Sequence, residues 1–423
     1  MEKKLIIIGA GPAGLASAIG ACENGVAPDD ILIIEREREL GGVLNQCIHD
    51  GFGEYSLGKS LTGTEYAEFF INKVKELKIP YLTDSTVLSI TPEKEITFVS
   101  TTLGYTTIKA QAIILAMGCR ERSHGSLRIA GTRPAGIFSA GTVQRFINID
   151  GHLPGKRVVL FGSGDIGLVT ARRLMLEGAK IVGAYEGKKY PRGLDKNVKE
   201  CLEDFGISLQ TGKTISKILG KERVEGVIIS DIDENHKIIK GTEQQVKCDT
   251  IVLSLGLTPD NIISMDAGIE IGRKTHGPVV DQSYRTSLDG VFACGNALHI
   301  HDLADFISRE SHKAGRCAGA YVNGKLPSPT KALEISYNDD IKYTVPQKLS
   351  LPFYDASNYI VLSYRVARVM QRAKISLIVD GEAIYSEEQY DISPSRRNKI
   401  KLYPDLLAKL SEATEVRLEA MEV

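Results

Sequence analysis

Two glycine-rich segments about 150 residues apart constrain this chain more than any other feature. Residues 9–14 read GAGPAG and residues 162–167 read GSGDIG, and a short apolar run precedes each. Glycines spaced Gly-x-Gly-x-x-Gly between a buried strand and a helix allow a tight turn, let a pyrophosphate approach the backbone and let the helix pack closely on the strand. Each segment therefore predicts a βαβ unit that binds a dinucleotide.

The sequence around the first segment completes this pattern. The apolar run 4–8 predicts a buried parallel strand, and an Ala-, Leu- and Ile-rich helix is expected over 12–24. A second strand over 31–34 leads directly to Glu35, which lies 21 residues beyond Gly14. At this distance a carboxylate is expected to bind the ribose of the dinucleotide.

The second segment shows the same order of elements. A strand is expected over 157–161, a helix over 165–177 and a strand over 180–185, followed by Glu186, 19 residues beyond Gly167. A carboxylate at this place accepts hydrogen bonds from a free ribose 2′-hydroxyl and repels a 2′-phosphate. The second segment is therefore expected to bind NAD in preference to NADP.

Charged residues near the second segment leave alternatives open. Lys188, Lys189 and Arg192 follow Glu186 closely and either line a solvated loop or offer a site for the 2′-phosphate of NADP. Asp165 stands in the first turn of the predicted helix, where a carboxylate suits the helix dipole. We interpret Asp165 as a structural residue that leaves the glycines open to phosphate.

Further segments resemble one flavoprotein superfamily. The residues that carry the likeness are Glu35-Arg36, Gly41-Gly42, AIILAMG at 112–118, GLTPD at 256–260 and TSLDGVFACGN at 286–296. They occur in the order typical of the superfamily and, with the glycine segments, cover about residues 1–325. The chain thus resembles the pyridine nucleotide-disulfide oxidoreductase-like proteins with two dinucleotide-binding domains, which include glutathione- and thioredoxin-reductase-like enzymes.

The resemblance implies an α/β fold with two Rossmann-like three-layer ββα domains, the NAD domain being inserted in the FAD domain. The residues that follow predict a small C-terminal β-rich domain in addition. The expected boundaries are 1–122 and 282–328 for the FAD-binding domain, 123–281 for the NAD(P)-binding domain and 329–423 for the C-terminal domain. In the last of these, β-rich runs at 359–366, 374–379 and 399–402 are separated by turn signals.

The resemblance also implies which residues bind the cofactors. FAD would be bound by Gly9, Gly11, Pro12, Ala13, Gly14, Glu35, Arg36, Gly41, Gly42, Val43, Val87, Ala116, Gly118, Gly295, Asn296 and Leu303. NAD(H), with NADP(H) as the less favoured alternative, would be bound by Gly162, Gly164, Asp165, Ile166, Gly167, Glu186 and Gly256. Superfamily members usually carry Gly-Asp at 295–296, so the carboxylate contact is lost here, although an amide still bonds a ribityl hydroxyl.

The positions of the cysteines indicate whether electrons could leave the flavin through a disulfide. Disulfide-reductase branches carry a redox pair, but only Cys47 follows Gly41-Gly42, and 131–155 holds no cysteine. A dithiol mechanism within this chain is therefore not expected. The resemblance places Cys47 near the isoalloxazine ring, where a lone thiol either cycles through a sulfenic acid or stays inert, and we favour the inert state. Cys47 and His49, which could shuttle a proton, are the candidates for catalytic residues.

Three polar residues, His299, His301 and Asp302, follow Asn296 at close range. They either open a helix whose N-terminus faces the flavin or belong to a metal site. Because His-x-His-Asp lacks the usual spacing to a fourth ligand, we favour the helix and expect no metal.

Composition excludes several classes of protein. A net charge of −1 without a Lys/Arg-rich tail argues against nucleic-acid binding. No apolar run reaches the ~18–20 residues that span a bilayer. The seven cysteines are scattered without a C-x-x-C pair, which is typical of reduced thiols and predicts a cytoplasmic protein.

The amino-acid sequences of three segments resemble those of a narrower branch of FAD-dependent oxidoreductases. These segments are 41–53, 131–148 and 293–306. Some members are NADH oxidases, and others stand beside a glycerol-3-phosphate-dehydrogenase-like or amine-oxidase-like flavoprotein. We predict an FAD-dependent enzyme that takes hydride from NADH and passes electrons to oxygen or a partner redox protein. The alternative is a non-catalytic or electron-relay FAD subunit of such a complex. A homo-oligomer or a hetero-complex is expected.

Overall fold

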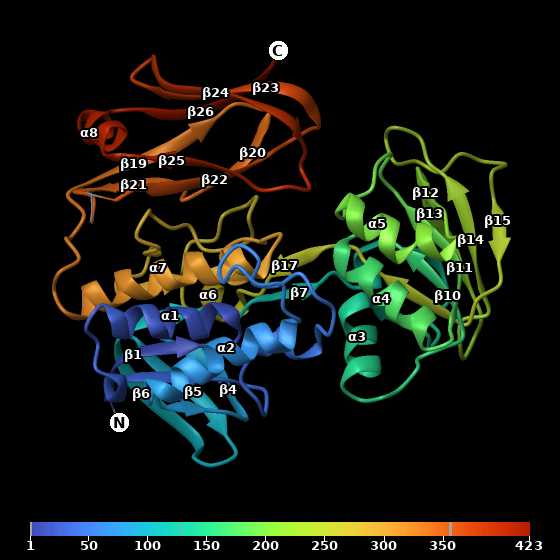
Figure 1. Ribbon diagram of the computed structural model, residues 1–423, viewed down its shortest axis with the longest axis horizontal. Coiled ribbons are helices and arrows are strands. Elements are labelled where there is room, and N and C mark those ends of the chain that lie inside the picture. The colour runs from blue at the N-terminus through green and yellow to red at the C-terminus, as the bar shows by residue number, and fades with distance from the viewer. Residues whose placement is uncertain (1, 128, 355–357) are drawn as a thin grey trace. The chain divides into compact units, whose positions relative to one another are not determined.

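The computed structural model describes residues 2–127, 129–354 and 358–423 (Figure 1). The chain divides into two compact units. Residues 1–45, 50–119 and 259–423 form the first unit, and residues 46–49 and 120–258 form the second. Strands β7 (Cys119–Glu121) and β17 (Leu257–Pro259) pair with each other where the chain passes from one unit to the other.

A mostly parallel sheet forms the centre of the first unit, with strand order β3-β2-β1-β6-β5-β4 and β18 also paired to β6. Its strands are β1 (Glu2–Ile8), β2 (Ile31–Ile34), β3 (Tyr81–Leu82), β4 (Ser85–Ile90), β5 (Glu95–Ser100), β6 (Gly104–Leu115) and β18 (Val291–Ala293). In β1, Ile7 pairs with Ile33 on one side and Ile114 on the other. A strand buried between parallel neighbours needs apolar residues on both faces, which explains its continuous apolar run.

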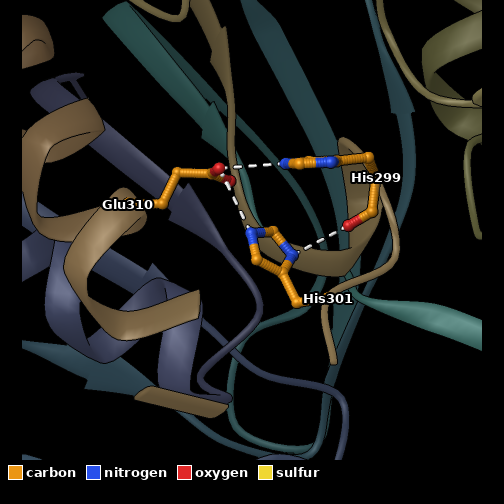
Figure 2. A group of neighbouring side chains, drawn as sticks. All are labelled: His299, His301 and Glu310. Atoms are coloured by element: carbon orange, nitrogen blue, oxygen red, sulfur yellow. Dashed lines mark hydrogen bonds and ion pairs between the residues drawn. The ribbon is translucent and has the colours of Figure 1, made fainter. Parts of the chain in front are cut away.

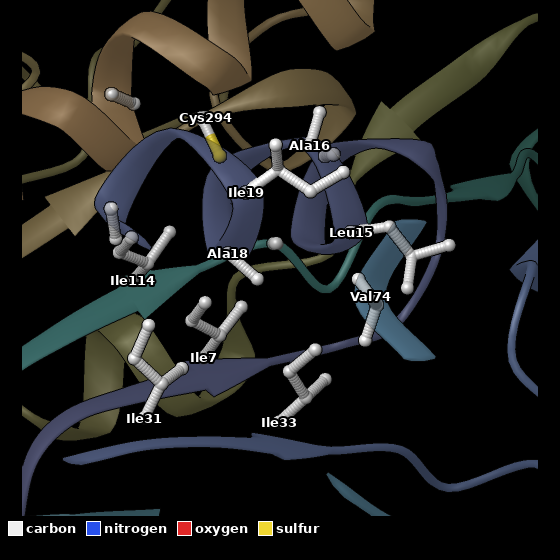
Figure 3. Close-up of a cluster of buried hydrophobic side chains, with 14 of the residues drawn as sticks. Ile7, Leu15, Ala16, Ala18, Ile19, Ile31, Ile33, Val74, Ile114 and Cys294 are labelled. Carbon is white, nitrogen blue, oxygen red and sulfur yellow. The ribbon is translucent and has the colours of Figure 1, made fainter. Parts of the chain in front are cut away.

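Helices α1 (Pro12–Glu23), α2 (Gly63–Glu76) and α7 (Ala304–Val322) belong to the first unit, as does the short α6 (Ile262–Asp266). Helices α1 and α7 lie against each other without room for side chains at two points. A Cβ on Gly20 would lie 2.2 Å from the His312 carbonyl oxygen, and one on Gly315 would lie 1.9 Å from that of Ser17. The other side of α1 meets apolar side chains of β1 and β2 (Figure 3). This double burial fixes α1, and with it the glycine segment at its start.

The second unit is built on a five-stranded parallel sheet of order β12-β11-β10-β16-β9. Its strands are β9 (Ile137–Ser139), β10 (Arg157–Phe161), β11 (Lys180–Glu186), β12 (Leu209–Thr211) and β16 (Thr250–Leu253). A further sheet contains β8 (Ala130–Gly131), β13 (Lys213–Leu219), β14 (Gly226–Asp231) and β15 (Gln244–Val246). The helices are α3 (Ala140–Asn148), α4 (Asp165–Leu176) and α5 (Asp195–Cys201). Two sheets and a helical layer make the predicted ββα arrangement.

The C-terminal part of the first unit is β-rich and has a hydrophobic core of its own. Its strands are β19 (Lys331–Tyr337), β20 (Ile341–Val345), β21 (Lys348–Leu351), β22 (Ile360–Val366), β23 (Met370–Val379), β24 (Glu382–Ile392), β25 (Asn398–Leu402) and β26 (Val416–Glu422). They form the sheets β21-β19-β26-β23-β24 and β20-β22-β25, and α8 (Pro404–Glu412) follows β25. We call residues 331–422 the C-terminal domain.

The predicted fold class is confirmed: the structure is α/β, with two Rossmann-like sheets and a β-rich C-terminal domain. Strand β1 begins two residues earlier than expected, and α1 and α4 each end one residue earlier. Helix α8 was not predicted. The assignment of domain boundaries at 122, 281 and 328 stays a prediction; the contacts group residues 259–281 with the first unit. Each helix among the described residues is too short or too polar to cross a membrane.

Candidate dinucleotide-binding sites

The first glycine segment forms a tight loop between β1 and α1. Gly9 has a φ of +101°, and a Cβ there would lie 2.5 Å from the Ala116 carbonyl oxygen. A Cβ on Gly14 would lie 1.8 Å from the carbonyl oxygen of Gly9. At Gly11, by contrast, no described atom lies within 4 Å of the Cβ position. The fold itself thus requires Gly9 and Gly14, whereas the space at Gly11 is left open beside the N-terminus of α1, where a phosphate is favourable.

The carboxylate of Glu35 closes one side of this loop. Its Oε2 accepts a hydrogen bond from the Ala10 backbone N–H at 2.6 Å, and its Oε1 accepts one from Glu37 N–H at 2.9 Å. Glu35 is buried at the end of β2, which pairs in parallel with β1. Parallel pairing therefore brings the predicted ribose acid to the glycine loop.

Two more predicted FAD segments, around Gly41-Gly42 and Gly295, converge on the same loop. The Gly41 N–H donates to the Ala10 carbonyl oxygen at 2.8 Å. Gly42 has a φ of +59°, and a Cβ there would lie 2.9 Å from the Gly11 Cα. A Cβ on Gly295 would lie 2.6 Å from that of Ala13. The close approaches at Gly42 and Gly295 explain why glycine stands at these two positions.

Other predicted FAD residues are not in these contacts. Val87 is buried within β4, Val43 is exposed, and Arg36 lies near Glu37 with its Nε 3.8 Å from Oε1. Gly118 accepts a hydrogen bond from Asp260, and Leu303 is the N-cap of α7. Their role in cofactor binding stays a prediction.

The second glycine segment repeats this geometry between β10 and α4. Gly162 has a φ of +95°, and a Cβ there would lie 2.2 Å from the Ser254 carbonyl oxygen. A Cβ on Gly167 would lie 2.4 Å from the Cβ of Ser254. Glu186 Oε2 accepts hydrogen bonds from Ser163 N–H at 2.9 Å and from Ser163 Oγ at 2.6 Å. In each loop, the backbone N–H of the second residue, Ala10 or Ser163, donates to the carboxylate at the end of the next strand.

Arg192 distinguishes the second loop from the first. Its Nε lies 3.2 Å from Glu186 Oε2, and its NH2 donates to the Ser254 carbonyl oxygen at 2.5 Å. Burial raises the pKa of Glu186, but Arg192 and the hydrogen bonds from Ser163 and Lys188 outweigh it and hold the pKa below its usual range. The carboxylate is thus charged, and Arg192 is its partner within the loop.

Asp165 ties the start of α4 to the loop beyond Arg192. Its Oδ1 accepts hydrogen bonds from Leu194 N–H at 2.8 Å and from Asn197 Nδ2 at 2.6 Å. These bonds support the structural interpretation of Asp165. Gly256 has a φ of +96° and Ile166 is partly buried on α4; their contact with NAD stays a prediction.

The chain was compared with known proteins. The family model of the pyridine nucleotide-disulphide oxidoreductases matches residues 3–316. The chain belongs to this family.

Curated relatives of this oxidoreductase are distant. The small chain of NADPH glutamate synthase from Halomonas elongata is 25% identical, over 74% of this chain and 67% of that protein. An NADH oxidase of Methanocaldococcus jannaschii is 24% identical, over 76% and 68%. A ferredoxin–NADP reductase of Flavobacterium johnsoniae is 25% identical, over 70% and 81%. The crystal structure of T. acidophilum thioredoxin reductase superimposes with a TM-score of 0.62 at 23% identity, covering 76% of this chain and 98% of that one, and supports the fold.

Members of this family bind FAD and use NAD(P)H, and this oxidoreductase is an FAD-dependent enzyme of that type. Its residues fit both cofactors. The open space at Gly11 admits a pyrophosphate, and the first turns of α1 and α4 have no side-chain cap among the described residues, so their N–H groups remain available to phosphates.

Cys47 and His49 lie in residues 46–49, a segment that packs as part of the second unit. The Cys47 Sγ lies 3.9 Å from Gln144 Oε1 on α3, and the neighbouring Gln46 Nε2 donates to the Gly141 carbonyl oxygen at 3.2 Å. Burial raises the pKa of the Cys47 thiol to about 12. A thiol that stays protonated is a poor nucleophile, which supports the inert interpretation.

The expectation that His299 and His301 open a helix is wrong, because α7 begins at Ala304. Both histidines are buried in the loop before it, and both face Glu310 on α7 (Figure 2). Nε2 of His299 lies 2.9 Å and Nε2 of His301 3.1 Å from Glu310 Oε2. Nδ1 of His301 lies 2.9 Å from the His299 carbonyl oxygen. Sequence spacing missed Glu310 because it stands two turns inside the helix.

These three side chains have the donor types of a metal site, and their donor atoms lie within 4.8 Å of one another. Arg397 NH1, however, lies 3.5 Å from Glu310 Oε2 and supplies a competing positive charge. We therefore describe the group as a buried ionic cluster, and the absence of a metal stays a prediction.

Asn296 takes part in the same loop. Its Oδ1 accepts a hydrogen bond from His301 N–H at 2.9 Å, and its Nδ2 lies 3.6 Å from Cys119 Sγ. The amide oxygen is thus held by the protein, and the remaining amide N–H is the group that could reach a ribityl hydroxyl.

Sequence reasoning also missed Asp305, a buried carboxylate in the first turn of α7. It accepts hydrogen bonds from Gly53 N–H at 3.1 Å, Tyr55 N–H at 3.1 Å and Ser56 Oγ at 2.7 Å. It thereby holds the loop that follows Gly41-Gly42. An acid in a first helical turn is a recognisable signal, but its partners lie about 250 residues away in the chain.

Proposed function

We propose that this oxidoreductase takes a hydride from NADH onto FAD and passes the electrons to oxygen or to a partner redox protein. The observation that carries the proposal is the repeated loop: each glycine segment meets a buried carboxylate, Glu35 in one case and Glu186 in the other. FAD, when bound, supplies the chemistry of accepting a hydride and releasing electrons.

The roles of the chain in this reaction are binding and orientation. The loop at 9–14 and the first turn of α1 would hold the FAD pyrophosphate, and the loop at 162–167 with α4 would hold that of the nicotinamide cofactor. Glu35 and Glu186 would bind the adjacent riboses. Hydride transfer needs positioning more than acid–base catalysis, so neither Cys47 nor His49 is required for this step.

A preference for NADH over NADPH is part of the proposal. Glu186 is charged at neutral pH, since its pKa is held low, and a carboxylate repels a 2′-phosphate. Arg192 lies against Glu186 and the Ser254 carbonyl, so its charge is already engaged. Lys188 and Lys189 leave NADPH as the alternative.

Oxygen or a redox protein is the proposed electron acceptor. The raised pKa of Cys47 argues against a thiolate route in this chain. Similar proteins described as an NADH oxidase and a ferredoxin–NADP reductase are consistent with oxygen or a redox protein as the acceptor. A cytoplasmic location stays a prediction from the scattered cysteines.

Anaerobic stopped-flow measurement of flavin absorbance tests the proposal. NADH is expected to bleach the flavin. NADPH is expected to bleach it with a kcat/KM at least about tenfold lower, because the carboxylate of Glu186 repels its 2′-phosphate. The reduced protein is then mixed with oxygen, quinones or disulfides. Failure of both nicotinamides to bleach the flavin would overturn the proposed activity.

A second candidate function is an electron-relay FAD subunit of a larger complex. One relative is a small chain of glutamate synthase. In this interpretation the C-terminal domain, which has a hydrophobic core of its own, would dock to a second flavoprotein or to another copy of this chain. Affinity purification from the native host distinguishes the two. A stoichiometric second flavoprotein, together with a silent isolated chain, would select the relay.

A further inference from the structure

A pocket of about 260 Å³ lies in the first unit between α7 and the C-terminal domain. In Figure 1 the strands β22 and β25 lie above α7. Six cationic side chains line the pocket: Arg309, Lys313, Arg316, Arg397, Lys399 and Lys401. None of the residues predicted to bind FAD or NAD is among its lining, so the pocket is distinct from both dinucleotide loops.

Five of the six cations form two stripes, one on α7 and one on β25, and Arg397 directly precedes β25. Arg309, Lys313 and Arg316 are spaced four and three residues apart, which places them on one face of α7. Lys399 and Lys401 alternate along β25 and therefore project from the same face of its sheet. A helix stripe thus meets a strand stripe of the same charge across the pocket.

Acidic residues in the pocket are already engaged elsewhere. Asp281 Oδ2 lies 2.7 Å from Arg285 Nε. Glu310 is bound by His299 and His301 and lies 3.5 Å from Arg397. Within the described parts of the chain, the other five cations have no carboxylate within ion-pair distance. Among the described residues, the positive charge of the pocket therefore exceeds the negative charge.

This crowding has a cost that an anion would remove. Burial, together with Arg309 and Lys401, lowers the pKa of Lys313. Burial and then the neighbours Arg397, Arg309 and Lys401 lower the pKa of Lys399. Like charges in a partly desolvated space destabilise one another. A bound anion would offset this repulsion and so raise the pKa of both lysines.

Aromatic rings hold the cations in place. Lys313 Nζ lies 4.3 Å and Lys401 Nζ 4.7 Å from the ring centroid of Tyr359. Phe306 is likewise contacted by Arg397 at 5.1 Å and by Lys399 at 5.3 Å. Cation–π contacts reduce the freedom of long side chains, so four of the six cations lose less conformational entropy when a ligand binds.

Tyr284 adds an independent sign of a functional site. This aromatic residue lines the pocket and has a φ of +63°, a left-handed conformation that a bulky side chain rarely adopts. Such backbone strain persists where the surrounding structure enforces it and is concentrated at ligand sites. Its hydroxyl would donate a hydrogen bond to an anion in the pocket.

We propose that this pocket binds a phosphorylated small molecule that carries at least two negative charges. Five Lys and Arg side chains without a carboxylate partner among the described residues converge from two elements, and they match the oxygens of phosphate groups better than a single carboxylate. The size and concavity of the pocket suit a small ligand, whereas a nucleic acid would need an extended basic surface. The ligand would bridge α7 and the C-terminal domain. This inference depends neither on the electron acceptor nor on the choice of nicotinamide.

Isothermal titration of the FAD-loaded full-length protein with inorganic pyrophosphate tests the proposal. The pocket variant is Lys313→Gln/Lys401→Gln, and the charge-matched control is Lys221→Gln/Lys240→Gln, which replaces two exposed lysines of the second unit. Pyrophosphate is expected to bind the wild type and the control equally, and the pocket variant at least about tenfold more weakly, because two charge-assisted contacts are lost.

Two further measurements keep the result decisive. Circular dichroism verifies folding, and Arg309→Gln, an exposed single change, serves if the double variant does not fold. Saturating NAD⁺ tests whether pyrophosphate occupies the loop at 162–167 instead. No binding to the wild type, equal affinity in the pocket variant, or complete displacement by NAD⁺ would each overturn the proposal. Tighter binding of a hexose bisphosphate or of AMP would support it and name the source of the phosphate.

Discussion

Arg365 and Asp302 form an ion pair, with NH2 2.5 Å from Oδ1, that joins the C-terminal domain to the loop following Asn296. Arg365 is buried and also donates to Tyr343 Oη at 2.9 Å and to the Ile300 carbonyl oxygen at 3.0 Å. The other oxygen of Asp302 accepts from Arg397 N–H at 2.7 Å. The C-terminal domain is thus bonded to the segment predicted to lie beside the flavin.

Replacing Arg365 is expected to destabilise the protein strongly. Arg365→Met leaves Asp302 Oδ1 and the carbonyl oxygens of Ile300, Pro394 and Ser395 without the guanidinium that donates to them, so the free energy of unfolding should fall by about 3 kcal/mol. Urea denaturation followed by circular dichroism measures it. The control is Arg372→Met, which removes an exposed, solvent-screened pair with Glu388 and should leave the free energy of unfolding nearly unchanged. Equal losses in the two variants would contradict the role of the buried Arg365 guanidinium.

Two glycines of the first loop should respond differently to alanine. In Gly11→Ala the new Cβ meets no described atom, so the stability of the FAD-free protein should be retained, while the approach of the FAD pyrophosphate is blocked. In Gly14→Ala the Cβ collides with the Gly9 carbonyl oxygen, and unfolding itself should become easier by roughly 1–3 kcal/mol.

Flavin content per chain and thermal unfolding of the FAD-free protein separate the two effects. Gly125→Ala is the control, because the Cβ there has its nearest described neighbour at 3.5 Å. Full flavin occupancy in Gly11→Ala would contradict the assignment of this loop to FAD.

Neutralising Glu186 should relax the selection between nicotinamides. Glu186→Gln keeps an acceptor for Ser163 but removes the charge that repels a 2′-phosphate, and it frees Arg192. The ratio of kcat/KM for NADPH to that for NADH is expected to rise by about tenfold or more. Glu203→Gln, an exposed change in the same unit, should leave the ratio unchanged. A ratio that stays constant in both would argue against Glu186 as the discriminating residue.

The thiol of Cys47 should be unreactive at neutral pH. Because burial raises its pKa to about 12 from an ordinary 9.0, its thiolate fraction at pH 8 is about a thousandfold below that of an unperturbed cysteine. Alkylation by iodoacetamide, followed by mass spectrometry across pH, should show slow modification that accelerates only in strong alkali. Cys47→Ser should reduce its flavin with NADH within about twofold of the wild type; a tenfold loss would restore a catalytic role.

His299 should make stability depend on pH in the mildly acidic range. Burial lowers its pKa from 6.5 to about 4, so between these values the unfolded chain binds a proton that the folded chain does not. Stability is therefore complete above pH 6.5 and declines as the pH falls towards 4, by about 3 kcal/mol from this group.

Urea unfolding at several pH values measures this decline. His299→Gln should flatten the curve between pH 6.5 and 4, whereas the exposed control His152→Gln should keep the wild-type slope. An unchanged slope in His299→Gln would show that other groups govern acid sensitivity.

Local sequence order determined the two βαβ units. Strand, glycines, helix, strand and acid come within 35 residues in each case, and the structure brings Glu35 to Ala10 and Glu186 to Ser163 as parallel pairing requires. The β-rich C-terminal domain was also predicted from alternating runs and turn signals. These features depend on hydrophobic periodicity and on backbone conformations that only glycine adopts readily. Both are local properties of the chain, so the sequence alone was enough to predict them.

Only the tertiary structure decided which distant side chains meet. Arg192 met Glu186 rather than solvent, Glu310 joined the two histidines, and Arg365 reached Asp302 from 63 residues away. The facing cation stripes of α7 and β25 are separated by some 80 residues of chain. Such contacts depend on how whole elements pack, because burial and charge compensation are properties of the assembled core and not of any short segment.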